Sequence, residues 1–465
     1  MTSTRWKHNR SEPLFASIKD LAGSVSRDEI VTPLYQTSAS ICRDVVQYTA
    51  SDPHQTSDRI DRILTSRLWG FPIMFALLAA IFWITITGAN VPSAMLAEMF
   101  GHLERYLSLT FAALNAPDWL HGLLVLGLYR GVSWVVSVML PPMAIFFPVF
   151  ALLENAGYLP RIAFNMDRLF KGAGGHGKQS LTMAMGFGCN AAAILSTRII
   201  ESPRERMLAI LTNNFVPCNG RWPILILLSS LFMAAGIGGG LSTMVTAAMV
   251  MGIVLFGILV TLVVSWVLSK TALKGVPTRY TLELPPYRRP KIWNTILRAT
   301  LDKSLFVLKR AVLVAAPAGV VTWTLANLIV GHQSLLEHVV GFFDPFAQAL
   351  GLDGYILIAF ILGLPANEIV LPILLMGYLS TGAMIEVENM ADLKQIFLDH
   401  GWTWLTALNM MLFSLLHYPC GTTLFNIYQE TKSPKWTFVA FALPTAIAIG
   451  VTYTVSSIVR GMGWV

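Results

Sequence analysis

Three of the four cysteines lie beside glycine or proline in otherwise apolar segments. The segments are Gly186-Phe187-Gly188-Cys189-Asn190, Val216-Pro217-Cys218-Asn219-Gly220 and Tyr418-Pro419-Cys420-Gly421-Thr422. Glycine and proline interrupt helices, so backbone carbonyls become available beside the thiols. Sulfur, carboxamide and carbonyl donors together suit a borderline transition metal, whereas Ca2+ and Mg2+ require oxygen ligands. The three cysteines therefore predict a metal pathway, with simple packing of small buried side chains as the alternative.

A further pair of candidates follows a similar break, Gly363-Leu364-Pro365-Ala366-Asn367-Glu368. Glu368 is the only acidic residue in the apolar run 354–380. An ionisable side chain at membrane depth is a functional candidate, as a ligand, proton acceptor or gate, and the alternative is a carboxylate that caps a half-helix. The predicted pathway residues are Cys189, Asn190, Cys218, Asn367, Glu368 and Cys420. The predicted helix breaks are Gly186, Gly188, Pro217, Gly363, Pro365 and Pro419.

The chain that positions these residues has the composition of a membrane protein. Of its 465 residues 54% are hydrophobic and 13% are charged, with a mean hydropathy of +0.60. Soluble domains carry about 25% charged residues, so disorder and an ordinary soluble enzyme are excluded. The absence of a Cys-x-x-Cys pair excludes a zinc ribbon. The net charge of +7 is interpreted as a marker of topology, and no nucleic-acid partner is expected.

Nine apolar runs are candidate membrane segments. They cover residues 69–88, 120–155, 179–199, 207–232, 241–268, 304–331, 354–380, 402–428 and 437–459. Residues 1–68 contain no such run and no signal-peptide pattern. We therefore expect a cytoplasmic leader with an amphipathic helix near residues 57–64.

The loops between the runs differ in charge. Basic residues dominate 161–178, 198–206 and 270–303, whereas acidic residues dominate 331–353 and 381–401. Because Lys and Arg accumulate in cytoplasmic loops, the first three are predicted to be cytoplasmic and the last two external. The run 179–199 then begins and ends inside, and the run 354–380 begins and ends outside. Each is predicted to be a re-entrant hairpin rather than a single span.

The two hairpins also match in spacing. Pro141 precedes Asn190 by 49 residues and Pro317 precedes Asn367 by 50. Each hairpin is followed by a run that Pro-Cys interrupts. We therefore predict an all-α polytopic membrane protein with an inverted repeat, whose binding site lies near the bilayer midplane. The expected regions are the leader 1–68, the first helix and first repeat 69–268, a basic cytoplasmic loop 269–303 and the second repeat 304–465.

One further motif resembles a phosphate-binding loop, Gly172-Ala173-Gly174-Gly175-His176-Gly177-Lys178-Gln179. The pattern requires Ser or Thr at position 179 to hold magnesium, and a strand before it. Neither is present, so we expect no GTP site in this chain and no enzymatic activity.

The ordered motifs resemble the membrane domain of the bacterial ferrous iron transporters of the FeoB family. Besides the breaks, the resemblance rests on Asp58-Arg59-Ile60-Asp61-Arg62, Leu152-Leu153-Glu154-Asn155-Ala156-Gly157-Tyr158 and Asn367-Glu368-Ile369-Val370. It covers roughly residues 57–455. It implies Fe2+ as the substrate, two gate hairpins, and passage of Fe2+ past Cys189 and Cys420. Cys218 also stands where relatives carry a cysteine.

The chain departs from the family in two ways. Relatives carry a GTP-binding domain ahead of the membrane part, so we expect that the GTPase is absent here or supplied in trans. Asn367 stands where relatives usually have Lys, and Ala191-Ala192 replaces Val-Pro. Uptake does not require a nucleotide, because two charges moving inward across 100 mV release about 4.6 kcal/mol, enough for roughly thousandfold accumulation.

The leading hypothesis is a transporter of the bacterial inner membrane that carries Fe2+ into the cytoplasm, with a cytoplasmic N-terminus and Glu368 near the outer entrance. One alternative cargo is Mn2+, Zn2+ or a nucleoside-like solute. Another alternative is a membrane subunit gated by a separate GTPase. The expected partners are the divalent metal, a separate GTPase or small accessory protein at the cytoplasmic face, and further copies of the chain.

Overall fold

The computed structural model describes residues 27–45, 55–66, 68–234, 240–275, 287, 291–385, 387 and 389–464. The chain divides into two compact units, residues 1–60 and 61–465. In the first unit, α2 (Arg27–Val45) is a helix whose described side chains are all exposed. The helix α3 (Gln55–Leu64) confirms the helix expected near residues 57–64, and its last turn belongs to the second unit.

Among the described residues, five helices of the second unit are long and apolar enough to cross a membrane. They are α4 (Gly70–Ala113), the continuous helix Asp118–Ala156, α12 (Gly240–Lys270), α14 (Leu305–Asn327) and α21 (Pro434–Gly461). About 20 residues suffice to span the hydrocarbon core. Large apolar side chains such as Leu255, Leu259 and Trp266 of α12 are exposed, as expected for a surface that faces lipid. The prediction of a multi-pass membrane protein is confirmed.

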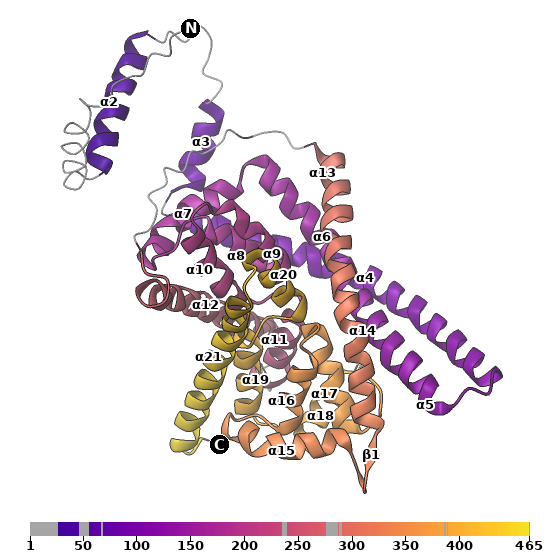
Figure 1. Ribbon diagram of the computed structural model, residues 1–465. Coiled ribbons are helices and arrows are strands. Elements are labelled where there is room, and N and C mark those ends of the chain that lie inside the picture. The colour runs from indigo at the N-terminus through magenta and orange to yellow at the C-terminus, as the bar shows by residue number, and fades with distance from the viewer. Residues whose placement is uncertain are drawn as a thin grey trace, which may run out of the picture. The chain divides into compact units, whose positions relative to one another are not determined.

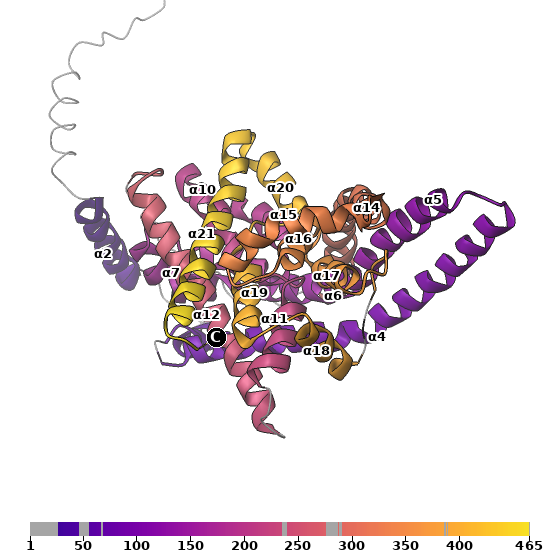
Figure 2. The same cartoon turned by 90° about the horizontal axis from the view of Figure 1, so that it is seen from below.

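The helix α4 continues well beyond the predicted run 69–88. Its 44 residues measure roughly 66 Å at 1.5 Å per residue, about twice the thickness of the hydrocarbon core. It packs along the helix Asp118–Ala156, which comprises α5 (Asp118–His121), the π-helical η1 (Gly122–Tyr129) and α6 (Arg130–Ala156). Figure 2 shows α5 and the C-terminal part of α4 reaching away from the other helices of this unit.

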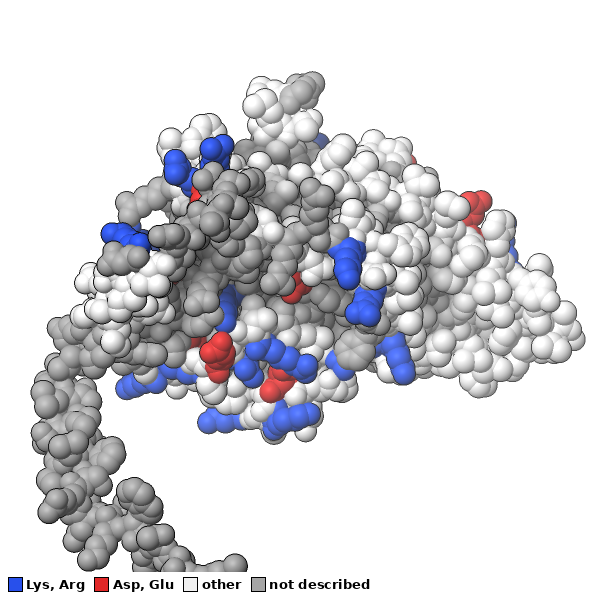
Figure 3. All heavy atoms as spheres, turned by 90° about the horizontal axis from the view of Figure 1, so that it is seen from above, with Lys and Arg blue, Asp and Glu red and all other residues white. Residues whose placement is uncertain are grey.

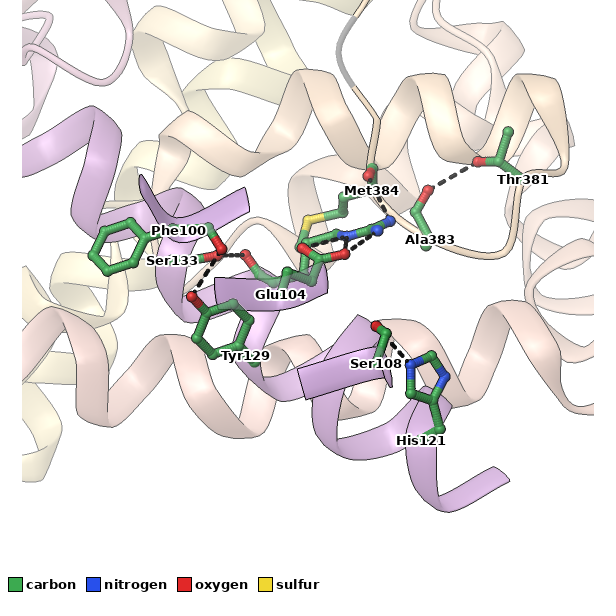
Figure 4. Close-up of polar contacts among 10 residues, drawn as sticks. Phe100, Glu104, Ser108, His121, Tyr129, Ser133, Thr381, Ala383 and Met384 are labelled. Carbon is green, nitrogen blue, oxygen red and sulfur yellow. Dashed lines mark hydrogen bonds and ion pairs between the residues drawn. The ribbon is translucent and has the colours of Figure 1, made fainter. Parts of the chain in front are cut away.

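Polar contacts join this helical pair to a segment that follows the second hairpin (Figure 4). Arg130 forms an ion pair with Glu104 of α4, and its Nη1 donates a hydrogen bond to the Met384 carbonyl, 3.4 Å away. The Tyr129 hydroxyl donates to the Phe100 carbonyl at 3.0 Å. The charged residues of the C-terminal part of α4 are therefore partly paired within the protein.

The first half of the repeat contains a hairpin and a broken span. Its elements are α7 (Leu159–Gly172), α8 (Gln179–Gly188), α9 (Asn190–Ser196), η2 (Thr197–Ile199), α10 (Pro203–Thr212), η3 (Asn213–Phe215), α11 (Trp222–Leu228) and η4 (Ser229–Met233). The hairpin α8–α9 reverses at Cys189. The broken span runs from α10 to η4 and is interrupted at residues 216–221.

The second half follows α13 (Ile292–Arg298), η5 (Ala299–Ser304) and α14. Its elements are β1 (Ile329–Val330), β2 (Gln333–Ser334), α15 (Leu335–Ala349), α16 (Gly354–Leu362), η6 (Asn367–Ile369), α17 (Val370–Leu379), α18 (Met390–Asp399), α19 (Trp404–Leu416) and α20 (Gly421–Thr431). The strands β1 and β2 pair antiparallel, with Ile329 opposite Ser334. The helices α15 and α16 meet at 110°.

The hairpins enter from opposite ends of the unit. Figure 1 shows α7, which leads into the first hairpin, at one end, and α15, which leads into the second, at the other. The predicted inverted pair of re-entrant hairpins is confirmed. Lys and Arg gather on the face seen from above in Figure 3, at the end where α7 and α13 lie. This is the arrangement that a cytoplasmic assignment of the basic loops predicts.

Side-chain caps begin several of the second half's helices. The Ser334 hydroxyl accepts the Glu337 N–H at the start of α15, and the Asp353 carboxylate accepts the Ile356 N–H at the start of α16. Thr403 caps α19 in the same way. Such caps satisfy N–H groups that no helical partner can reach, so these short helices can begin sharply.

Candidate metal pathway at the helix breaks

The two hairpin breaks have the same backbone conformation. Cys189 has φ −154° and ψ 118°, and Ala366 has φ −154° and ψ 125°. Each residue is extended and immediately precedes an asparagine, Asn190 or Asn367, that begins the next half-helix. The sequence match between the hairpins is therefore also a match of geometry.

Each broken span, α10 to η4 in the first half and α19 to α20 in the second, is hydrogen-bonded to the hairpin of its own half. The Asn219 N–H donates to the Gly188 carbonyl at 3.2 Å, and the Gly421 N–H donates to the Leu364 carbonyl at 2.7 Å. Asn219 and Gly421 are the residues directly after Cys218 and Cys420. Backbone carbonyls at the hairpin breaks, which lack helical partners, thus accept hydrogen bonds from the residues that follow the Pro-Cys pairs.

The three cysteines lie in this junction as free thiols. Cys189 is buried, and Cys218 and Cys420 are half-buried. The Asn367 Nδ2 lies 3.8 Å from the Cys218 sulfur, and the Cys420 sulfur lies 3.2 Å from the Thr423 hydroxyl. No group of three His, Cys, Asp or Glu side chains within the described residues is arranged to hold a metal ion. The thiols are therefore arranged along the junction rather than as one closed chelating site.

Glu368 connects the two halves. It is half-buried on η6, and a methyl carbon placed on Gly220 would lie 2.4 Å from its carboxyl carbon. Gly220 is thus the point where the second hairpin meets the first Pro-Cys break, and only a residue without a side chain leaves room there. Among the described residues Glu368 has no ion-pair partner within 4 Å. Its expected position near the outer entrance stays a prediction.

Two asparagines of the junction, Asn213 and Asn367, have buried amide oxygens without hydrogen-bond partners in the described chain. The Asn213 Nδ2 donates to the Asn190 Oδ1 at 3.2 Å. A buried acceptor without a donor is costly, and a passing cation would satisfy it. Gly186, predicted to be a helix break, instead lies inside α8, where a side chain would meet the amides of Asn190 and Asn213 at 3.1–3.2 Å.

The other predicted break residues occupy the interruptions. Gly188 ends α8, and a methyl carbon there would lie 2.0 Å from the Phe146 ring of α6. Gly363 and Pro365 lie between α16 and η6. Pro217 and Pro419 lie in the interruptions of the two broken spans. The predicted residues from both halves therefore meet at one set of breaks.

Arg221 is a residue of this junction that the motifs do not reveal. It is fully buried, and its side chain crosses from the first half to the second. The guanidinium donates to the carbonyls of Leu415, His417 and Tyr418 at 2.8–3.2 Å. It also donates to the carbonyl and the Oδ1 of Asn214. An arginine within an apolar broken run was the available signal, since such residues are rare in membrane segments.

Comparison with known proteins agrees with the two-half arrangement. The family Gate, described as nucleoside recognition, matches residues 136–232 and 308–434, one segment in each half. The family described as the ferrous iron transport protein B C terminus matches residues 250–302. No solved structure gives a significant match.

Relatives named Fe(2+) transporter FeoB align along nearly the whole chain. The protein of Staphylococcus aureus strain COL is 31% identical over 96% of this chain and 66% of its own length. The protein of Methanocaldococcus jannaschii is 28% identical over 97% of this chain and 66% of its own length. The protein of Campylobacter jejuni is 26% identical over 90% of this chain and 69% of its own length. The chain spans about two thirds of the length of these relatives. With the gate hairpins, both family matches and this extended similarity, the chain belongs to the FeoB family and carries its gate-containing membrane region.

Proposed function

We propose that this chain moves Fe2+ across the membrane along the junction of the two hairpins and the two Pro-Cys breaks. Two contacts between the halves support the proposal. Glu368 lies against Gly220, and the Asn367 amide lies 3.8 Å from the Cys218 sulfur. A carboxylate and an amide of the second half thereby face a thiol of the first. Sulfur and oxygen donors in one place suit a borderline divalent metal.

The pathway proposed from these contacts includes Cys189, Asn190, Cys218, Asn367, Glu368 and Cys420. Its donors come from different elements and no three of the His, Cys, Asp or Glu side chains converge in the described chain. This arrangement favours brief, successive contacts over tight retention. Transport requires such weak binding, because an ion held by a complete chelating site leaves slowly.

The names of the relatives support iron as the cargo. We further propose a bacterial inner-membrane location, a cytoplasmic N-terminus and inward movement driven by the membrane potential. The remaining partner proposals are a separate GTPase or small accessory protein at the basic face, and self-association. A partner would be detected by co-purification with the full chain, and self-association by its mass in detergent.

Fe2+ uptake into proteoliposomes under reducing conditions tests the pathway. Cys218→Ser and Glu368→Gln are expected to lower initial uptake severalfold. Cys42→Ser is the matched control, because Cys42 is exposed on α2 in the first unit. Uptake by Cys218→Ser and Glu368→Gln equal to that of the unmodified chain would contradict the proposed pathway.

Competition identifies the cargo. Excess unlabelled Fe2+ is expected to suppress uptake of labelled Fe2+, with weaker suppression by Mn2+ or Zn2+ and none by nucleosides. Stronger suppression by Mn2+ or Zn2+ would indicate that this metal, rather than Fe2+, is the transported ion. Suppression by a nucleoside would favour the alternative cargo, consistent with the description of the Gate family.

A further inference from the structure

Arg221 fills a position lined by five oxygen atoms. These are the carbonyl oxygens of Asn214, Leu415, His417 and Tyr418 and the Oδ1 of Asn214, all 2.8–3.2 Å from the guanidinium nitrogens. Arg221 is 0% exposed, so water does not compete for these contacts. No carboxylate of the described chain lies within ion-pair distance of it. The hydrogen bonds of the guanidinium are therefore made to neutral oxygens, while the Glu368 carboxylate lies close by against Gly220.

Three of the five oxygens, those of Leu415, His417 and Tyr418, lie at one end of a broken helix. The helix α19 ends at Leu416, and His417 caps it in an extended conformation before Pro419. The last carbonyls of a helix have no helical partners, and the helix dipole makes this end negative. A cation is therefore favoured at this end of α19, and the guanidinium supplies one.

The same environment binds free ions in other carriers. In secondary transporters built from inverted repeats, unwound carbonyls and the C-terminal ends of half-helices coordinate Na+. Here Asn214 contributes two more oxygens, and its Nδ2 donates to the His417 carbonyl, which holds that carbonyl in place. The five oxygens are neutral, so a monovalent cation would match the charge that Arg221 carries.

The two halves differ at this point. Arg221 stands three residues after Cys218, and Thr423 stands three residues after Cys420. The Thr423 hydroxyl instead contacts the Cys420 sulfur. The cation thus occurs once in the repeat, and it lies beside the junction of Cys218, Gly220 and Glu368.

We propose that the Arg221 guanidinium is a tethered cation that occupies a monovalent-cation site at the end of α19, in the place where a sodium-coupled carrier would bind its coupling ion. Metal movement through the adjacent breaks then needs no Na+ or K+ at this site. Removing the side chain opens the site to a free ion. The statement about metal movement rests on the proposed transport function. The statement about cation binding does not, because binding to the Arg221→Ala variant is measured separately.

The first experiment is thermal unfolding of the purified full chain in NaCl, KCl or choline chloride at equal ionic strength. Arg221→Ala is expected to unfold several degrees higher in NaCl or KCl than in choline chloride, because an ion that binds only the folded state stabilises it. Arg221→Lys keeps a tethered charge and is expected to be insensitive to the cation, like the unmodified chain. Millimolar guanidinium is expected to stabilise Arg221→Ala alone.

Arg310→Ala is the matched control. Arg310 donates to the side-chain oxygens of Asn426 and Gln429 on α20, so its removal does not open the end of α19. Its unfolding temperature is expected to be the same in the three salts. Equal unfolding of Arg221→Ala in all salts would overturn the proposal and leave Arg221 as a structural cross-link. Failure to obtain folded Arg221→Ala in Na+, K+ or guanidinium would also overturn it.

Uptake provides the second readout. Fe2+ uptake by the unmodified chain is expected to be equal in Na+, K+ and choline, whereas uptake by Arg221→Ala is expected to be severalfold higher in Na+ or K+. A requirement for Na+ in the unmodified chain would overturn the proposal. Absence of Fe2+ uptake by the unmodified chain in every salt would contradict the proposed function and leave the thermal test of the cation site in force.

Discussion

The carboxylate of Glu368 lies against the backbone of Gly220. The two residues are 148 positions apart and belong to opposite halves of the repeat. Their contact joins the second hairpin to the first Pro-Cys break, beside Cys218. The position of Glu368 therefore depends on the lack of a side chain at Gly220.

Gly220→Ala is expected to displace Glu368. The added carbon would lie 2.4 Å from the carboxyl carbon, and the side chain of Glu368 can turn away because it ends in a flexible group. Fe2+ uptake should fall severalfold while the unfolding temperature changes little. Gly252→Ala on α12 is the control, since no atom lies within 4 Å of the added carbon there. Equal uptake by the two variants would show that the position of Glu368 is unimportant.

Gly188→Ala should destabilise the first hairpin. The methyl group would lie 2.0 Å from the buried Phe146 ring, and overpacking of this kind costs about 1–3 kcal/mol. Thermal unfolding measures the loss. Replacing Phe146 by Leu in the same chain should recover part of it, because the smaller side chain vacates that volume. No recovery in the double variant would place the strain elsewhere.

Asp61→Asn should loosen the end of α3 from α7. Both Asp61 oxygens accept hydrogen bonds from Arg161 at 2.9 Å, and Arg161 is 1% exposed. The substitution removes the charged acceptor of two hydrogen bonds from a buried guanidinium, at a cost of up to about 3 kcal/mol. Unfolding by heat or denaturant measures it. Asp58→Asn, at an exposed position of α3, is expected to have almost no effect.

The same pair predicts a dependence on pH. Burial by itself would raise the pKa of Asp61, but hydrogen bonds from Arg161 and Tyr287 lower it below the ordinary value. A lowered pKa stabilises the folded state above the pKa of an unfolded aspartate, about 3.9, and this stabilisation is lost as the pH falls through the folded value. The difference in stability between the unmodified chain and Asp61→Asn should therefore be constant near pH 7 and shrink below about pH 4. A difference that grows on acidification would contradict it.

Glu104→Gln should weaken the contact between α4 and α6. Glu104 and Arg130 are 18% and 27% exposed, so solvent screens the pair only in part, and we expect a loss of about 1–2 kcal/mol. Glu98→Gln is the control, because the Glu98–His102 pair is mostly exposed. A double-mutant cycle with Arg130→Gln isolates the interaction. A coupling energy near zero would show that the contact to the Met384 carbonyl, rather than the ion pair, holds Arg130.

The hairpins could be predicted from the sequence because their signals are local. Loop charge predicts the side of the membrane, and a glycine or proline two residues before Asn190 and Asn367 marks the reversals. The junction between the halves could not be predicted in this way. Three of the carbonyl partners of Arg221 lie about 195 positions away, and no local pattern encodes that distance. The contact of Gly220 with Glu368 depends on tertiary packing for the same reason.

The full length of α4 could not be predicted from the sequence because local charges interrupt its apolar pattern. Residues 89–113 include Glu98, Glu104 and Arg105, and their charges lower the mean hydropathy below that of a membrane segment. The helix nevertheless continues to Ala113, and Glu104 pairs with Arg130 on the neighbouring helix. A hydropathy average lowers the score of a segment for each charged residue, whether or not that residue forms an ion pair in the folded protein.

The extended residues Cys189 and Ala366 give the two hairpins one backbone shape with different side chains. The first half supplies two thiols and a guanidinium, whereas the second supplies one thiol, a carboxylate and a threonine hydroxyl. An ion moving along the proposed pathway from one side would meet these groups in the reverse order of an ion moving from the other. The backbone conformation is repeated between the halves but the side chains are not, so the two directions along that pathway would be chemically different. The gradient would decide the net direction of movement, and the order of the groups would decide how easily the ion leaves toward each side.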